Sequence, residues 1–266
     1  MSPRQRFLLA LAVLVPAAAA RPVAAADLPD IMRSGALRVL VAADESPEFF
    51  ALEPGPSPGF EREILEGFAR LHKVRLEAVP IVRFDDAIPA LLRGQGDLIT
   101  GMIDTEARRR QVAFTVEVLP SRLLLVTRAP RVFRSLPELG AERVGVVSGT
   151  SWGEAAVSAG VPQTQIGSLP DLKAILGALR DGKLGAAVMS LSDLVLERRR
   201  DPQLQAGPFL GSPRSAAWAV RKADVQLARA LSDHVESLRR TPSWSRMAVT
   251  YFGRDALTLL GRAKTE

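Results

Sequence analysis

The sequence contains no cysteine among its 266 residues. This absence excludes disulfide bonds, a thiolate nucleophile, zinc–thiolate sites and a lipid anchor attached to a cysteine. Histidine occurs only as His72 and His234, both among charged residues of predicted helices. We therefore expect no metal site and no cofactor.

A strong excess of basic charge is also missing. The full sequence has 35 basic and 29 acidic residues, and three of the basic residues lie in the segment 1–26, so the remainder has a net charge of +3. The arginine clusters at 108–110, 198–200 and 239–240 are not interleaved with aromatic residues, as a platform for single-stranded nucleic acid requires. We expect no nucleic-acid partner.

Long apolar runs are confined to the N-terminus. Arg4 and Arg6 precede the run FLLALAVLVPAAAA, which is shorter than a bilayer span, and Ala24, Ala25 and Ala26 form a small-residue cleavage site before Asp27. Residues 1–26 are therefore predicted to be a secretory signal peptide. Without later apolar runs, and without cysteine, the mature chain is expected to be a soluble monomer in a Gram-negative periplasm.

Strand and helix patterns alternate in the first part of the mature chain. The helix at 59–71 carries an apolar stripe, which predicts that Glu61 and Arg62 face solvent on the opposite side. The alternation predicts a mainly parallel sheet covered by helices. The predicted order is strand 37–43, helix 59–71, strand 74–80, helix 85–94 and strand 97–101.

The same kind of unit returns later in the chain, with strands at 122–128, 143–147, 184–190 and 216–222, and helices at 171–182, 192–200 and 225–240. Ser192 is the expected cap of the helix at 192–200. This pattern predicts two α/β lobes, each with its own sheet. We assign 27–127 plus 218–266 to the first lobe and 128–217 to the second, inserted lobe. A two-strand hinge would join them and leave a ligand cleft between them.

Five segments in the expected order resemble the family 3 bacterial extracellular solute-binding proteins of the polar-amino-acid type. They are GFEREILEGFARL, DDAIPALLRGQGDLITGMIDTEARRRQVAFT, SLPELGAERVGVVSGTS, GALRDGKLGAAV and SWSRMAVTYFG, and the resemblance covers about residues 30–253. It implies the α/β type II periplasmic-binding-protein fold. It also implies a small-molecule ligand bearing a carboxylate, an amino acid or a related organic acid, that is passed to an inner-membrane ABC permease.

The resemblance places the ligand-binding arginine of the family at Arg108, three residues after Thr105. A guanidinium binds a planar carboxylate through two parallel charge-assisted hydrogen bonds. Successive helix residues point in different directions, so Arg109 and Arg110 are interpreted as surface charges.

Small polar residues are the other candidate ligand contacts. Thr150 and Ser151 lie at the start of a predicted second-lobe helix, where they could cap the helix, bind the same carboxylate, or do both. Thr100 and Gly101 end a predicted strand at the cleft edge, and the resemblance implies backbone and hydroxyl contacts there.

The sequence departs from the family pattern where an aspartate would bind the ligand's ammonium group. Ser190 stands at that position, and Asp193 follows three residues later. The acidic residues near the end of the first strand are Asp44 and Glu45. A buried ammonium requires an anionic partner. Two alternatives therefore stay open: a carboxylate without an amino group, or a ligand held by Glu45 or Asp44.

The resemblance also leaves other functions on the same fold open. Related lobes occur in sensors, in lytic transglycosylases and in accessory proteins of periplasmic quinoprotein dehydrogenases. A cyclohexadienyl-dehydratase-like enzyme would use Glu45, Asp44 or Glu154 as a general acid. Nothing in the sequence marks one of these carboxylates as tuned for catalysis, so binding without catalysis is the preferred interpretation.

Overall fold

The computed structural model describes residues 27–43, 45–82, 84–148 and 150–265. The predicted signal peptide, 1–26, and the candidate ligand residue Asp44 lie outside the described residues. In the described part of the chain, every helix is too short or too polar to cross a membrane.

Nine strands of the described chain form one mixed sheet in the order β2-β1-β3-β9-β5-β8-β6-β7, with β4 paired to β9. The neighbours of β1 are parallel to it, and so are those of β6, whereas β5 and β9 run antiparallel to their neighbours. The strands are β1 (Ala36–Ala42), β2 (Arg75–Ile81), β3 (Leu98–Ile103), β4 (Ala113–Phe114), β5 (Leu119–Arg128), β6 (Val144–Val147), β7 (Ile166–Leu169), β8 (Ala186–Ser190) and β9 (Leu204–Val220).

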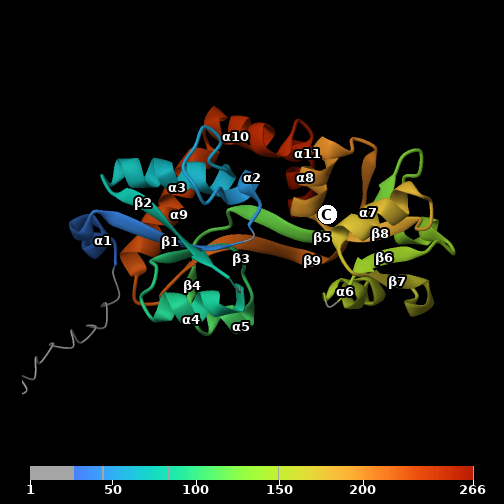
Figure 1. Cartoon of the computed structure of the whole chain (residues 1–266), viewed down its shortest axis with the longest axis horizontal. Coiled ribbons are helices and arrows are strands. Elements are labelled where there is room, and N and C mark those ends of the chain that lie inside the picture. Colours follow the sequence, from blue (N-terminus) through green and yellow to red (C-terminus); the bar gives the residue numbers. More distant parts are fainter. Residues whose placement is uncertain (1–26, 44, 83, 149, 266) are drawn as a thin grey trace, which may run out of the picture.

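The expectation of two separate sheets is wrong, because β5 and β9 belong to both halves of the molecule. They pair with each other from Leu119↔Ala216 to Arg128↔Leu204. The C-terminal end of β9 also pairs with β3, and the middle of β5 pairs with β8. Figure 1 shows these two strands running between the first lobe on the left and the second on the right. The ladder is thus continuous through a two-strand hinge.

The N-terminal part of β9 was not predicted from the sequence. Only 216–222 has the strand pattern, whereas the preceding residues include Gly207, Pro208, Gly211 and Pro213, which are typical of turns. Pairing with β5 overrides that local preference. At Gly207 an added Cβ would lie 2.9 Å from the Leu125 carbonyl oxygen, so the close approach of the two strands explains this glycine.

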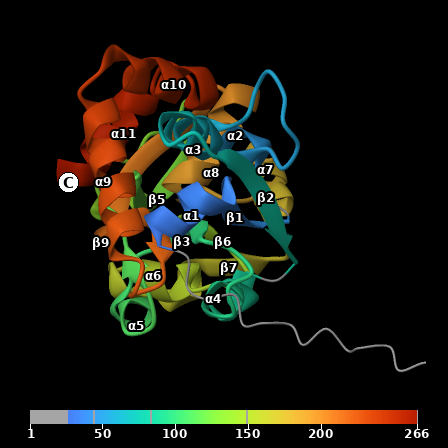
Figure 2. The same ribbon diagram turned by 90° about the vertical axis from the view of Figure 1, so that its left-hand side faces the viewer.

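Helices cover both faces of the sheet, with α3 and α10 on one side and α4, α5 and α6 on the other (Figures 1 and 2). Short 3₁₀ turns span Phe84–Asp86, Leu136–Leu139 and Gln163–Gln165. The helices are α1 (Leu28–Ser34), α2 (Pro47–Phe50), α3 (Phe60–Leu71), α4 (Ala87–Leu92), α5 (Glu106–Arg109), α6 (Trp152–Ser158), α7 (Leu172–Arg180), α8 (Leu191–Arg200), α9 (Val225–Arg239), α10 (Pro242–Phe252) and α11 (Ala256–Thr265).

The buried apolar residues divide between the two faces. One large cluster runs along both lobes on the side of α3, α9 and α10 and contains Trp218, Phe60 and Phe68. On the opposite face, a cluster around Leu91 packs under α4, and another around Val188 packs against α6. The sheet is therefore buried on both faces, as its parallel strands require.

Helix α3 differs from its predicted orientation. Glu61 and Arg62, expected to face solvent, are each only 4% exposed. Arg62 donates hydrogen bonds to the carbonyls of Ala51 and Leu52, and it pairs with Glu66 at 3.0 Å. The segment 47–58 and helix α10 cover the side of α3 that the periodicity marks as polar, which is why the prediction is wrong.

The start of α8 also differs from the prediction. Helix α8 begins at Leu191, and its cap is Ser190 rather than Ser192. The Ser190 hydroxyl accepts a hydrogen bond from the Asp193 backbone N–H at 3.0 Å and donates one to the Asp193 carboxylate at 2.5 Å. Ser190 and Asp193 thus bind each other at the helix start.

Helix α11 lies against the two hinge strands near α8 (Figure 1). Its Ala263 carbonyl accepts a hydrogen bond from Arg122 of β5 at 3.2 Å, and Lys264 pairs with Glu117 at 2.9 Å. This helix therefore connects the end of the first lobe to the hinge and brings Leu260 to the cleft.

Candidate functional site

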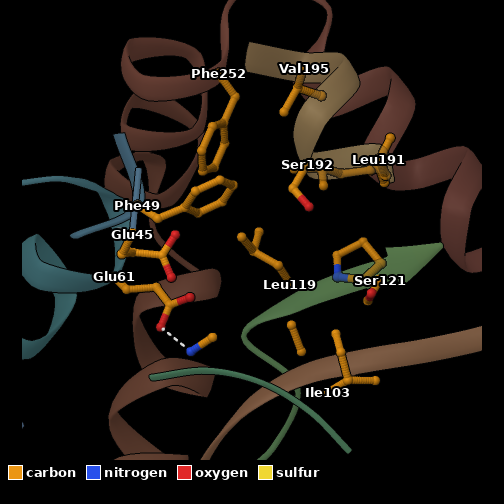
Figure 3. A pocket seen from close by; sticks show the side chains of 14 residues that line it. Glu45, Phe49, Glu61, Ile103, Leu119, Ser121, Leu191, Ser192, Val195 and Phe252 are labelled. Atoms are coloured by element: carbon orange, nitrogen blue, oxygen red, sulfur yellow. Dashed lines mark hydrogen bonds between the residues drawn. The ribbon is translucent and has the colours of Figure 1, made fainter. Parts of the chain in front are cut away.

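A cavity of about 110 Å³ lies where the two lobes meet the hinge (Figure 3). Its walls come from α2, α3, β3, β5, α8, β9, α10 and α11. Most lining side chains are apolar, and two carboxylates, Glu45 and Glu61, lie together on one wall. We call it the carboxylate cavity. Its main apolar side chains are Phe49, Ile103, Leu119, Val195, Phe252 and Leu260.

Glu61 is held in place by two N–H donors that reach the same oxygen. The indole Nε1 of Trp218 donates to Oε2 at 2.7 Å, and the backbone N–H of Gly101 donates at 3.2 Å. The second of these bonds is drawn in Figure 3, where the other oxygen of Glu61 faces the cavity. Burial, followed by the negative charge of Glu45, raises the pKa of Glu61 to about 7, although both donors oppose the shift.

Two glycines allow the backbone to bring Glu61 close to the Gly101 N–H. Gly59 precedes α3 with φ of 97°, and an added Cβ would lie 2.6 Å from the Pro47 carbonyl oxygen, so the chain enters α3 against α2. Gly101 has φ of 63° and lies where the pairing of β3 with β9 shifts register. The resulting bulge turns the Gly101 N–H toward Glu61.

We expect Gly101→Ala to lower the free energy of unfolding by about 1–2 kcal/mol, because an alanine at positive φ is strained. It should also disturb the site, since an added Cβ would lie 3.3 Å from Glu45 Oε2. The matched control is Gly182→Ala, with φ of 69° but with no atom within 4 Å of its added Cβ. Urea unfolding should show similar losses for both variants, whereas only Gly101→Ala should alter ligand binding. Unchanged binding by Gly101→Ala would contradict this role.

Glu45 follows β1 and lies beside Glu61 in Figure 3. Its Oε1 accepts a hydrogen bond from the Ser46 backbone N–H at 3.0 Å. The described residues that line the carboxylate cavity include no lysine, arginine or histidine. Two carboxylates therefore face this cavity, and its other walls are of low polarity.

A larger cavity of about 560 Å³ continues from the carboxylate cavity between the lobes, and we call it the inter-lobe groove. The two share Ile103, Ser121 and Ser192 in their walls. Most other residues of the groove come from β5, α6 and the hinge part of β9. Its polar side chains include Ser151, Glu154, Ser158, Ser190, Ser212 and Arg214. Together the two spaces are large enough for a small organic molecule.

The structure brings four of the predicted site residues to this cleft. Glu45 and Gly101 line the carboxylate cavity, whereas Ser151 and Ser190 line the inter-lobe groove. Ser151 occupies the cap position of α6. Ser190 lines the groove and is also the N-terminal cap of α8.

Three other predicted residues are not among the described residues that line either cavity. Thr100 is buried, and its hydroxyl donates to the Leu40 carbonyl at 3.4 Å within the sheet. The Thr150 hydroxyl donates to the Val147 carbonyl at 2.7 Å and accepts from the Trp152 N–H at 3.3 Å. Arg108 is half-buried, and its Nη1 donates to the Ile103 carbonyl at 2.8 Å. Their roles in ligand binding stay predictions.

Arg108 lies close to the cleft, because Ile103 lines both cavities. Burial lowers the pKa of Arg108 from its usual value, and the negative charge of Asp85 opposes that shift. Arg109 and Arg110 are exposed and pair with Asp104 and Glu106. Arg109 and Arg110 thus lie at the surface, whereas Arg108 is half-buried, and its role as a ligand contact stays a prediction.

Glu61 lines the carboxylate cavity, although its sequence pattern does not mark it as a candidate. Its place on the polar side of a helical stripe is the ordinary signature of a solvated residue. The sequence signal that could have indicated a buried start of α3 is Gly59, directly before Phe60. At this glycine the backbone approaches α2 closely.

Known proteins share this fold and parts of this sequence. A membrane-bound lytic murein transglycosylase F from Stutzerimonas stutzeri is 23% identical over 244 residues, which are 88% of this chain and 50% of the relative. A probable histidine-binding protein from Neisseria gonorrhoeae is 23% identical over 209 residues, 76% of this chain and 77% of the relative. The chain thus spans about half the length of the transglycosylase.

Among solved structures, an ancestral cationic amino acid solute-binding protein superposes with a TM-score of 0.72 at 22% sequence identity, covering 85% of this chain and 99% of that one. This likeness confirms the predicted fold class. The profile of the bacterial extracellular solute-binding proteins, family 3, matches residues 37–254. That range includes both lobes and the hinge, and the chain belongs to this family.

Proposed function

We propose that the protein is a periplasmic solute-binding protein, which captures a small carboxylate-bearing solute, an amino acid or a related organic acid, and delivers it to an ABC transporter. The observation that carries the proposal is the cleft of two connected cavities between lobes joined by β5 and β9. In this role the protein binds its ligand without converting it.

The hinge supports capture by closure. Since two strands connect the lobes, a change in their backbone angles can move one lobe toward the other while each lobe stays rigid. The cleft residues come from both sides of the hinge, with Glu61 on the first lobe and Ser192 on the second. A ligand that touches both sides stabilises the closed form. We propose the lobe boundaries 27–127 plus 218–266 and 128–217 for this motion.

Arg108 is the proposed partner of the ligand's carboxylate. Its guanidinium already donates a hydrogen bond at the Ile103 carbonyl, beside the passage between the two cavities. A change of side-chain rotamer would turn the fork toward the cleft. Two parallel hydrogen bonds would then form to a carboxylate. Ser151 of the second lobe is the proposed contact from the opposite wall.

The test is a thermal-shift screen of amino acids, carboxylates and amines with the mature chain, 27–266. A ligand at 100 times its dissociation constant should stabilise the protein by about 2.7 kcal/mol. Cells that express the inner-membrane ABC permease should then take up the same compound only when the protein is present. Absence of any stabilising compound, or stabilisation without protein-dependent uptake, would contradict the transport role.

The variant Arg108→Ala should weaken binding of the carboxylate-bearing ligand by about 2–5 kcal/mol, because a buried charge pair would lose one partner. Arg108→Lys should recover only part of this loss, since an ammonium cannot form the two parallel bonds. Arg109→Ala is the matched control, because Arg109 pairs with Asp104 at the surface. Calorimetry should show near wild-type affinity for it. Equal losses for both alanine variants would indicate a diffuse basic patch.

A further inference from the structure

A further cavity of about 400 Å³ lies where α8 meets the junction of α10 and α11, and we call it the rear pocket. Val195 and Phe252 line both the rear pocket and the carboxylate cavity, so they form the wall between the two spaces. Both side chains are labelled at the top of Figure 3. The described residues that line the rear pocket include none that line the inter-lobe groove. Its volume is in the range of small-molecule sites.

The charged residues that line the rear pocket are mainly arginines of two clusters in the sequence. Among the described lining residues, Arg198, Arg199 and Arg254 are basic and Asp255 is the one acidic residue, so positive charges exceed negative ones by two. Arginines on a convex surface need no ligand, whereas these border a cavity. The bottom of the cavity is apolar, because buried core residues form it: Val195, Phe252, Ala256 and Leu259. The pocket is therefore complementary to an anion with an apolar group.

Contacts within the protein use only part of the hydrogen-bonding capacity of the two arginines on α8. Arg198 Nη2 lies 2.8 Å from the Asp255 carboxylate. Arg199 Nη1 donates a hydrogen bond at 2.5 Å to the carbonyl of Tyr251 in the last turn of α10. A guanidinium carries several N–H donors in one plane. In the part of the chain that the structure describes, each of the two guanidinium groups therefore keeps N–H donors that can reach an anion.

The three arginines come from two different parts of the fold. Arg198 and Arg199 lie on α8, which packs against β5, β8 and β9, whereas Arg254 is exposed and follows α10. With the lobe boundaries proposed above, α8 belongs to the second lobe and Arg254 to the first. An anion that contacts both sides stabilises their arrangement. The rear pocket is thus a second place at which a ligand can connect the lobes.

We propose that the rear pocket binds a small organic acid, with its carboxylate between Arg254 and the arginines of α8 and its apolar stem against Phe252 and Leu259. The planar guanidinium fork matches a carboxylate through parallel charge-assisted hydrogen bonds. The site is separate from the cleft that is proposed to hold the transported solute, because Val195 and Phe252 lie between them. The acid connects the two lobes on the side away from the inter-lobe groove.

The experiment measures binding of 4-phenylbutyrate and 4-phenylbutanol to the mature chain by isothermal calorimetry. The two probes share an apolar stem, and only the first carries a negative charge. We expect the acid to bind at least about tenfold tighter than the alcohol, because the arginines attract the carboxylate. Equal affinities of the two probes, or no binding of the acid, would overturn the proposal.

Substitutions on either side of the pocket should change the affinity for the acid in opposite directions. Arg254→Gln should weaken binding by about fivefold, and Arg254→Lys should recover part of the loss. Asp255→Asn should strengthen binding by about threefold, because it removes a negative charge and releases Arg198. A merely structural role of Asp255 predicts no such gain. The matched control is Arg246→Gln on α10, which removes the same charge where Arg246 is exposed and bonds to Ser243, and it should bind the acid as the wild type does.

The remaining outcomes decide where the acid binds and which partner the arginines serve. Acid binding that is the same in the wild type, Arg254→Gln and Asp255→Asn would overturn the rear pocket as its site. Sedimentation of the protein with phosphatidylglycerol vesicles that requires Arg254, without binding of the free acid, would assign the arginines to a membrane surface and overturn the small-molecule site. The solute-binding function is tested separately, by the thermal-shift screen and by Arg108→Ala.

Discussion

The substitution Arg221→Met is expected to lower the free energy of unfolding by about 3–5 kcal/mol, because it leaves the buried Asp224 carboxylate without its cation. Arg221 follows β9 and is only 5% exposed. Its guanidinium lies 2.7 Å from the Asp224 carboxylate and 3.7 Å from that of Asp97, both of which are 1% exposed. It also donates hydrogen bonds to the carbonyls of Leu91 and Gly96.

This ion-pair network joins the end of β9 to the turn between α4 and β3, and it also includes Arg38 of β1, which pairs with Asp97 at 2.7 Å. The matched control is Arg229→Met on α9. Arg229 pairs with Asp233 at 3.9 Å, and the two side chains are 84% and 68% exposed. A surface pair of this kind contributes less than about 1 kcal/mol. Equal urea-unfolding midpoints and slopes for the two variants would show that the buried network is not stabilising.

The substitution Trp218→Ala, tested separately, is expected to lower the free energy of unfolding by about 3–5 kcal/mol. Trp218 lies on β9, is fully buried in the large core cluster, and is among its largest side chains. Its removal would leave a cavity between the sheet and α3 that the surrounding backbone cannot fill. Denaturant unfolding monitored by circular dichroism would measure the loss.

The companion variant Trp218→Phe separates packing from hydrogen bonding. Phenylalanine keeps most of the apolar contact but lacks the indole N–H that donates to Glu61 at 2.7 Å. We expect a smaller loss of stability than for Trp218→Ala. We also expect the pKa of Glu61 to rise further, because a hydrogen bond that favours the ionised carboxylate is lost. A carboxyl titration by NMR that shows no change would contradict the assigned role of this bond.

Several features follow from local sequence and match the structure. The apolar repeat predicts α3 at 59–71, and the structure has it at Phe60–Leu71. Thr105 caps the short helix α5, whose Arg108 is turned inward while Arg109 stays exposed. Neighbouring residues determine these elements through helix periodicity and capping, which act over a few residues. The order of such segments is sufficient to indicate the family and its α/β fold.

Which residues line the cleft depends on the tertiary structure. The sequence pattern marks Glu61 as solvated, yet α2, β9 and α10 surround it and raise its pKa. The N-terminal part of β9 contains turn residues, yet it forms a strand because β5 supplies the pairing. The sequence by itself determined most of the local elements and their order, because helix periodicity, strand alternation and capping act over a few residues. Tertiary structure alone brought Glu45, Glu61 and Leu260 to one cavity, because burial and charge proximity depend on segments far apart in the chain.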